Sequence, residues 1–185
     1  MMTAPTYGSA SADTGVGPQP KNQIVVSGKP DVQYLNIETA TNCYPGRLVK
    51  KGTHDNDLVV CTAGGAAIGV LGYEQAAKTY RPATRDTIYA QNDQAPVLSG
   101  KAVVLLYLAQ SQTVVKGDKL VAAASGMVSK ASAAAVPNSS TPVTSTSAQP
   151  TVTGPIPTEG IALAEAEESV TTVDVEGWIM ARMLI

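Results

Sequence analysis

The segment that decides the fold runs from Pro45 to Leu71 and reads PGRLVKKGTHDNDLVVCTAGGAAIGVL. Gly, Asn and Asp, which favour turns, separate short runs rich in Val, Leu and Ile. Three such runs occur in the segment: Arg47-Leu-Val49, Leu58-Val-Val-Cys61 and Ile68-Gly-Val-Leu71. The segment therefore predicts three short β-strands joined by tight connections.

A similar order of runs returns later in the chain. Its members are Lys116-Gly-Asp-Lys-Leu-Val121, Gly126-Met-Val128 and Gly160-Ile-Ala-Leu163. We align Gly46 with Gly117 and Gly69 with Gly160, and the extra length of the second copy falls in a Ser/Thr/Pro-rich stretch. This internal repeat predicts two related β-units that form one body.

Other β-rich runs fill most of the remaining chain, at a spacing typical of a compact barrel or sandwich. The 185 residues include no Phe and one Trp, and hydrophobic residues make up 44%. Val and Ile, which favour strands, must therefore supply much of the core. The predicted fold class is all-β. The further runs are Ile24–Val26, Val32–Glu38, Thr87–Ala90, Ala95–Leu98, Lys101–Ala109, Lys119–Ala122 and Val173–Ile185.

Two segments lack this pattern. Residues 1–23 are rich in Pro, Gly and Ser and predict an extended N-terminal arm. Residues 131–158 hold many Ser, Thr and Pro and no charge, which predicts a surface insertion rather than core. We therefore expect one β-domain over residues 24–185 that carries this insertion.

Charge and hydropathy exclude several classes of partner. Thirteen Lys and Arg against fifteen Asp and Glu give a net charge of −2, which argues against nucleic acid and anionic membranes. The longest apolar run, Ala102–Ala109, is much shorter than the ~20 residues of a membrane helix. The N-terminus lacks a basic start and an apolar stretch, so we expect synthesis in the cytoplasm.

Candidate catalytic groups are few. His54 lies with Asp55 and Asp57 in one short stretch, which could hold a cation, although a solvated turn is the favoured interpretation. A Cys–His pair of His54 with Cys43 or Cys61 is the weaker alternative, because it needs a third orienting group and a cleft, and the sequence shows neither. We expect both thiols to be reduced and buried rather than joined in a disulfide.

Other motifs also favour structural roles. The sequence has no G-x-S-x-G motif, and Gly64–Gly69 fits no phosphate-binding pattern and predicts a turn that leads into a strand. The acidic residues near the C-terminus predict a solvated face, whereas Lys78, Arg81 and Arg85 could meet an acidic protein surface. These acidic residues are Glu165, Glu167, Glu168, Asp174 and Glu176.

The order of short motifs over residues 40–185 resembles the head decoration, or capsid cement, proteins of tailed viruses of bacteria and archaea. Each motif is short, so the resemblance depends on their order and spacing. The motifs are Gly46-Arg-Leu-Val49, Ile68-Gly-Val-Leu71, Val97-Leu-Ser-Gly-Lys-Ala-Val103, Val115-Lys-Gly-Asp-Lys-Leu-Val121, Ser125-Gly-Met-Val128, Gly160-Ile-Ala-Leu163 and Ile179-Met-Ala-Arg-Met-Leu-Ile185.

The resemblance implies a small β-barrel or β-tulip-like domain on the exterior of an icosahedral capsid. It implies a homotrimer that cements neighbouring major capsid subunits of the expanded head, with no catalytic site, cofactor or metal. The arm could then cross a capsid subunit as an extended peptide. We expect Tyr7, Val16 and Ile24 to be its apolar contacts.

Two alternatives stay open. Val115–Val121 also resembles the hairpin of biotinyl and lipoyl carrier domains, but Ala124-Ser-Gly-Met-Val128 has no Lys at its tip. A receptor-binding or sugar-binding module of the virion is compatible with the same sequence.

Overall fold

The computed structural model describes residues 24–73, 87–131 and 162–185. The described part is all-β, with one 3₁₀ turn, η1 (Ala124–Gly126). The strands are β1 (Val25–Gly28), β2 (Asp31–Ile37), β3 (Leu48–Lys51), β4 (Asp57–Val60), β5 (Gly69–Leu71), β6 (Gln94–Ser99), β7 (Ala102–Leu108), β8 (Thr113–Val114), β9 (Lys119–Ala122), β10 (Val128–Lys130), β11 (Ala164–Ala166), β12 (Val170–Thr171) and β13 (Gly177–Met183).

Strands β2 to β6 form a closed barrel in the order β2-β4-β3-β5-β6, which we call the first ring. The β2–β4 pair is parallel and the other pairs are antiparallel. Its interior is filled by aliphatic side chains, Cys43 and Tyr89. The prediction of a small β-barrel is confirmed.

A second closed ring follows. Strands β7-β10-β9-β11-β13 lie in one sheet, and an additional pairing of β7 with β13 closes them. Strand β1 joins the outside of this second ring by pairing with β7. The β7–β10 pair is parallel and the other four are antiparallel, as in the first ring.

The two rings also share their register. Ile37 lies opposite Leu58 in the parallel pair of the first ring, and Leu108 lies opposite Val128 in that of the second. Starting from these residues, all five pairings of one ring map onto the five of the other without a shift. The prediction of two related β-units is confirmed, and each unit is a complete ring.

The matched positions share their burial. In the first ring the buried residues include Leu35, Ile37, Val49, Leu58, Leu71, Ala95 and Val97. In the same order, the registers match them to Leu106, Leu108, Leu120, Val128, Ala166, Ile179 and Ala181, which are also buried. Alternation along each strand therefore sends matching residues into both interiors.

The turn into the first strand of each repeat is the same. Gly46 and Gly117 have positive φ angles of 87° and 92°, a conformation that glycine adopts without steric cost. The Gly46 amide donates to the Leu71 carbonyl at 2.7 Å, and the Gly117 amide donates to the matching Ala166 carbonyl at 2.8 Å. The alignment of Gly46 with Gly117 is confirmed.

The third strand of the second repeat requires a correction. Val49 lies opposite Gly69, and the matching Leu120 lies opposite Ala164, so Gly69 corresponds to Ala164 rather than to Gly160. Gly160 itself lies outside the described residues. The glycine pattern of the internal repeat placed this strand wrongly, because the register of the strand is determined by its pairing with β9.

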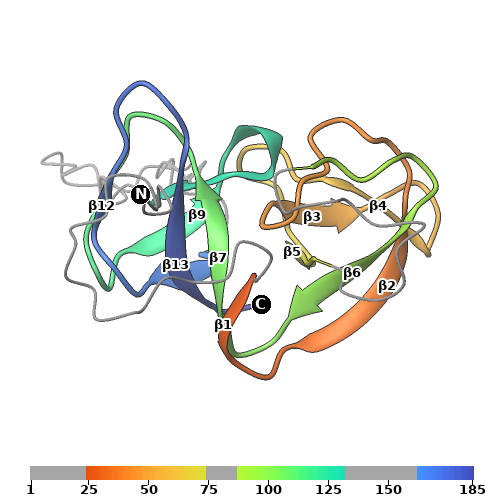
Figure 1. Cartoon of the computed structure of the whole chain (residues 1–185), viewed down its shortest axis with the longest axis horizontal. Helices are drawn as coiled ribbons and strands as arrows, with labels where there is room; N and C mark the ends of the chain where they lie inside the picture. The colour runs from red at the N-terminus through yellow and green to blue at the C-terminus, as the bar shows by residue number, and fades with distance from the viewer. Residues whose placement is uncertain (1–23, 74–86, 132–161) are drawn as a thin grey trace, which may run out of the picture.

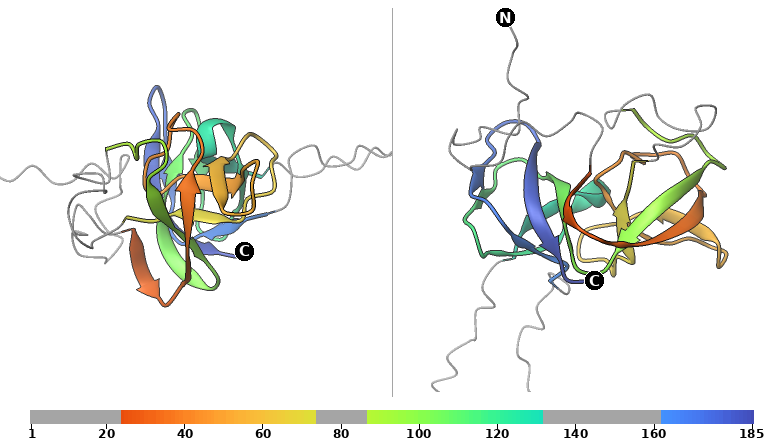
Figure 2. Two further views of the ribbon diagram at one scale, coloured as in Figure 1. Left: turned by 90° about the vertical axis from the view of Figure 1, so that its right-hand side faces the viewer. Right: turned by 60° about the horizontal axis from the view of Figure 1, so that its bottom comes forward.

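The rings lie side by side (Figure 1), and the tilted view separates them clearly (Figure 2, right). Leu48, Val70 and Leu98, on the outer face of the first ring, belong to the same buried cluster as Leu105 and Tyr107 of β7. One apolar junction therefore joins the two rings.

Some local expectations were wrong. Thr87–Ala90 forms no strand; Tyr89 is buried in the first ring, and its hydroxyl donates to the Gly72 carbonyl at 3.1 Å. Residues 173–176 form a loop before β13, and β8 and β12 were not predicted. Several predicted features lie outside the described residues. They are the arm (1–23), the basic residues Lys78, Arg81 and Arg85, and all of the predicted insertion except Ala131.

Candidate interaction surfaces

A cleft of about 390 Å³ opens at the junction of the rings. The loop before β3 supplies Asn42, Tyr44 and Arg47 from the first ring. The second ring supplies Tyr107, Ser125, Met127 and Glu176. The cleft is therefore assembled from both repeats.

Arg47 is the central contact of this cleft, and its side chain is only 5% exposed. Its guanidinium donates to the Ser125 carbonyl at 2.7 Å and to Glu176 Oε1 at 3.0 Å. It also lies over the Tyr44 and Tyr107 rings, at 5.2 and 4.7 Å from their centroids. Its Nε is a buried donor without a hydrogen-bond partner. Arg47 thus links the first ring to three segments of the second.

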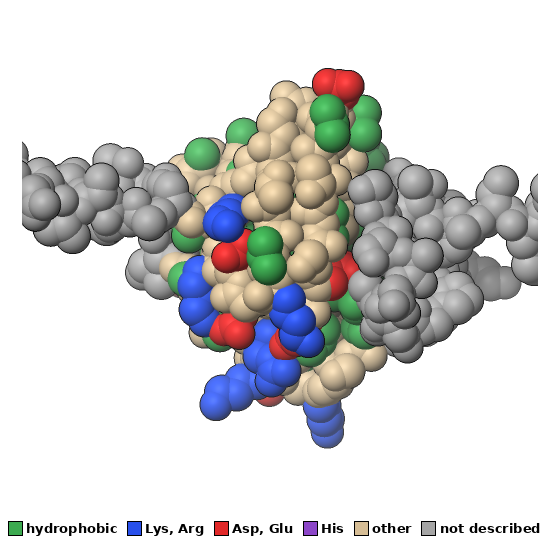
Figure 3. Space-filling model, turned by 90° about the vertical axis from the view of Figure 1, so that its left-hand side faces the viewer, with side chains coloured by type: hydrophobic (Ala, Val, Ile, Leu, Met, Phe, Trp, Pro, Cys, Tyr) green, Lys and Arg blue, Asp and Glu red, His purple; other side chains and the backbone are tan. Residues whose placement is uncertain are grey.

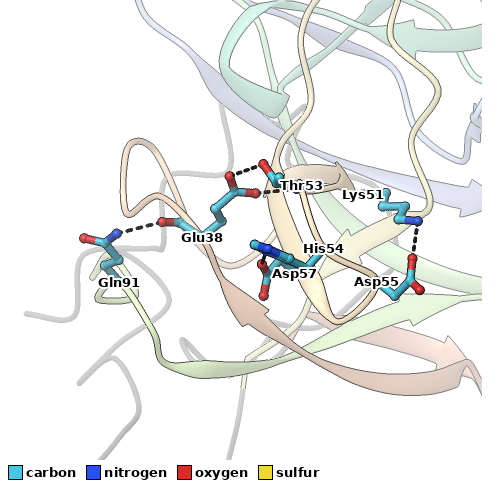
Figure 4. Close-up of polar contacts among 7 residues, drawn as sticks. All are labelled: Glu38, Lys51, Thr53, His54, Asp55, Asp57 and Gln91. Carbon is cyan, nitrogen blue, oxygen red and sulfur yellow. Dashed lines mark hydrogen bonds and ion pairs between the residues drawn. The ribbon is translucent and has the colours of Figure 1, made fainter.

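A second cleft, of about 450 Å³, lies on the first ring alone. Its lining residues include Asn36, Glu38, His54, Asp57 and Asn92. His54 Nδ1 lies 2.8 Å from Asp57 Oδ2, and both oxygens of Glu38 accept hydrogen bonds from Thr53 (Figure 4). These Thr53 bonds lower the pKa of Glu38, so its carboxylate stays charged in a largely polar cleft.

The three residues considered as a cation site do not converge. His54 pairs with Asp57, whereas Asp55 pairs with Lys51 on the other side of the turn (Figure 4). Within the described ranges, no group of three His, Cys, Asp or Glu side chains could hold a metal ion. The interpretation of Thr53–Asp57 as a hairpin turn is confirmed, because β3 and β4 flank it as an antiparallel pair.

Both cysteines are free and buried, as expected. Burial raises the pKa of the Cys43 thiol to about 11 and also raises the pKa of Cys61. Both thiols are therefore protonated at neutral pH, and His54 lies on an exposed turn. A Cys–His nucleophile has no support here, since the thiolate is the reactive form.

The acidic residues near the C-terminus only partly follow the prediction of a solvated face. Glu165 pairs with Lys119, and Glu167 pairs with Arg182 at 2.7 Å. Glu168 instead is buried, and its Oε1 accepts the Met180 amide hydrogen at 2.7 Å. Burial raises the pKa of Glu168, so the charged form of this side chain opposes folding.

Glu168→Gln is expected to raise the free energy of unfolding by about 1 kcal/mol at pH 7, because glutamine keeps the acceptor and removes the buried charge. The pKa of Glu168 is raised on folding, so its ionisation costs stability above the folded pKa and costs none below 4.5. Urea unfolding of both proteins between pH 3 and pH 8 measures this. A difference independent of pH would contradict the assignment.

Several large apolar side chains are exposed outside the clefts. Val32 and Tyr34 on β2 are 50% and 55% exposed, and Val173 and Val175 form an exposed pair in the loop before β13. Ile24, expected to touch the capsid, is 3% exposed and belongs to the core cluster of the second ring. Tyr7 and Val16 lie outside the described residues.

The outer face of the second ring is charged. Lys and Arg side chains alternate with Asp and Glu on the face drawn in Figure 3. The exposed pairs of this ring include Lys119–Glu165, Lys130–Asp118 and Arg182–Glu167. On this face the charges of the described residues nearly balance, and these residues form no basic stripe there.

The hairpin compared with carrier domains ends in a 3₁₀ turn. Its tip is Ala124–Gly126, and Lys119 and Lys130 are at the far ends of the flanking strands. A carrier domain has its modified lysine at the exposed tip of this hairpin. The turn at Ala124–Gly126 contains no lysine. In the described ranges there is also no helix long and apolar enough to span a bilayer.

One comparison with known proteins shows the family of this chain. The family described as "Structural cement protein (E217 gp24/Pam3 gp6)" matches residues 15–171. Among solved structures, the chain is similar to the head fibre gp8.5 N base of bacteriophage phi29, with 8% identity and a TM-score of 0.48. That match covers 84% of this chain and 94% of the other. The search of curated proteins finds no match. The chain belongs to the family of structural cement proteins of phages.

Proposed function

We propose that the protein binds the outer surface of an icosahedral phage capsid and cements neighbouring major capsid subunits. The observation that carries this proposal is the family match, which extends over most of the chain. The chemistry of the described clefts is consistent with a binding protein, since neither supplies a reactive thiol or a metal site. The role requires no cofactor, enzymatic activity, nucleic acid or membrane.

The mechanism is a linkage between binding and shell stability. A protein that binds the expanded head but not its competing states stabilises that head in proportion to the logarithm of its free concentration. Two rings joined by a buried apolar junction form a stiff body, which can hold two capsid subunits at a constant separation. We include a homotrimer in the proposal, because a ring of copies would hold several subunits at once.

Co-sedimentation tests the proposal. Purified protein mixed with expanded heads is expected to pellet at a stoichiometry close to that of the major capsid protein, and it should raise the temperature at which heads disrupt. Unexpanded heads are the control. Equal binding to both, or binding only to tails, would contradict the proposed role and favour a receptor- or sugar-binding module.

We further propose that the arm, residues 1–23, contacts the shell through Tyr7 and Val16. Ile24 is buried and its carbonyl accepts the Leu105 amide hydrogen at 2.8 Å, so the domain holds the base of the arm next to β7. An extended peptide anchored at one end loses less entropy when it binds.

Deletion of residues 1–20 is expected to leave thermal melting of the free protein within about 1 °C, because the described core does not include them. The same deletion should weaken retention on heads about tenfold, as expected for the loss of two apolar contacts. Tyr7→Ser with Val16→Ser is the matched variant with an intact length. Full retention of both proteins on heads would show that the arm makes no contact.

A further inference from the structure

The loop before β13, residues 173–176, presents two valines to solvent. Val173 and Val175 are 66% and 72% exposed, the highest values among the exposed large apolar side chains of the described ranges. The loop projects at the top of the second ring in Figure 1, and we call it the apolar tip. Single exposed apolar side chains are common on soluble proteins, whereas two on one projecting loop indicate a candidate contact surface.

The backbone at the start of the apolar tip is held by several hydrogen bonds. The Val173 carbonyl accepts two, from the amide and the hydroxyl of Ser111, each at 3.1 Å. Thr172, which is buried, donates its hydroxyl hydrogen to the Ala109 carbonyl at 2.6 Å and accepts the Gln112 amide hydrogen at 3.0 Å. The exposed valines therefore extend from a fixed backbone, which lowers the entropy lost when a partner covers them.

The end of the apolar tip is held by the junction of the two rings. Glu176 Oε1 accepts a hydrogen bond from the buried Arg47 guanidinium at 3.0 Å, although the Glu176 side chain is 46% exposed. The next residue, Gly177, already pairs with Leu108 in the second ring. Both rings therefore determine where the tip leaves the body of the protein.

The apolar tip differs in charge from the outer face of the second ring. The carboxylates of that face pair with Lys or Arg, as Glu165 and Glu167 do. Asp174, between the two valines, makes no ion pair with any residue that the structure describes. On the face drawn in Figure 3, apolar side chains lie beside an acidic one at the top of the ring, and the Lys and Arg side chains lie below them. The tip therefore fits a partner with an apolar recess and a basic rim.

The described surface of a second copy offers the tip no such recess. The junction cleft contains both Arg47 and Glu176 and is lined mainly by polar groups. The first-ring cleft is also largely polar, and its charged carboxylates, Glu38 and Asp57, would repel Asp174. The chemistry of the tip thus favours a different protein as its partner.

We propose that the apolar tip inserts Val173 and Val175 into an apolar recess of a major capsid subunit, with Asp174 against a basic side chain at the rim of that recess. This inference rests on the proposed cement function and assigns the contact to one surface of the chain. The family match ends at residue 171, so the tip lies outside the segment that carries the proposed function.

A double variant, Val173→Ser with Val175→Ser, tests the inference on expanded heads that lack the protein. Co-sedimentation is expected to show binding about 30-fold weaker than that of the wild type, because both valines lose their burial in the recess. Leu184→Ser is the matched control. Leu184 is 47% exposed and follows the other end of β13, so this variant should bind like the wild type.

Asp174→Lys tests the basic rim. It should weaken binding about tenfold at low ionic strength and less at high ionic strength, because two positive charges would meet at the rim and salt screens them. Binding that stays unchanged at low ionic strength would overturn the assignment of a basic rim.

Two measurements on the free protein distinguish the capsid from other partners of the tip. Both valines are largely exposed, so the double variant should melt and sediment like the wild type. A lower melting temperature would assign the tip to a contact within the chain. Weaker self-association would assign it to a second copy. Either result would overturn the inference.

Photo-crosslinking identifies the partner directly. Asp174→Cys places a thiol between the two valines, and a benzophenone maleimide should label it selectively, because Cys43 and Cys61 are buried. Irradiation on expanded heads is expected to join one chain to one major capsid subunit, whereas the same label on Leu184→Cys should give no such product. Products that join only copies of this chain, or equal products from both labelled positions, would overturn the inference.

Failure of this inference differs from failure of the cement role. If the wild type pellets with expanded heads and the double variant pellets equally well, the tip is not the contact and the cement role stands. If the wild type itself does not pellet with expanded heads, the cement role is wrong and the inference is overturned with it.

Discussion

Gly46→Ala is expected to destabilise the protein by about 4 kcal/mol. The φ of 87° already costs an L-residue about 1 kcal/mol, and the new Cβ would lie 2.5 Å from Trp178 and 3.1 Å from the Leu105 carbonyl oxygen. Relief of this clash requires the two rings to move apart at their junction. Thermal melting measures the effect, at about 2–4 °C for each kcal/mol in a chain of this length.

The matched control is Gly117→Ala at the corresponding turn of the second ring. Its φ of 92° imposes the same backbone cost, but a Cβ there enters open space. We expect a loss of about 1 kcal/mol. Equal losses at both positions would show that the backbone conformation, and not the junction, accounts for the effect.

Arg47→Ala is expected to cost about 3 kcal/mol. The substitution removes hydrogen bonds to Ser125 and Glu176, removes the contact with two tyrosine rings and leaves a cavity at the junction. The buried Nε of Arg47 has no hydrogen-bond partner, so Arg47 stabilises the native state less than a fully hydrogen-bonded guanidinium would. The expected loss of stability is therefore moderate.

Arg182→Ala is the matched control for an exposed ion pair. Arg182 is 57% exposed and its partner is Glu167, so we expect a loss below about 1 kcal/mol. Arg47→Met preserves much of the volume without the charge and should fall between the two. A loss at Arg47 no larger than at Arg182 would show that the guanidinium does not link the rings.

Much of the fold follows from local sequence signals. Short apolar runs predicted most strands, because alternation places one side of each strand in the core whatever its partner is. The repeated turns at Gly46 and Gly117 indicated two units, because a turn position with a positive φ favours glycine and is therefore visible in the sequence. The hairpin turn at Thr53–Asp57 was predicted for the same kind of reason.

The candidate surfaces were harder to predict. Arg47 was noted only as part of a strand motif, and nothing near it in sequence indicates burial between two rings. Glu168 was placed on a solvated face, although its carboxylate is buried and accepts the Met180 amide hydrogen. Both cases depend on partners more than ten residues away, and a composition pattern carries no information about such contacts.

The sequence alone predicted the all-β class, the two related units, several of the turns and the burial of both cysteines. These features depend on each residue and its near neighbours. Only the tertiary structure decided which strand pair in each ring is parallel, which register β11 adopts and which outer faces of the rings are buried. Leu48 and Lys119 occupy matching positions in matching strands, yet one is buried at the junction and the other is exposed. The difference arises because burial depends on which face meets another body, and that is a property of the assembled rings.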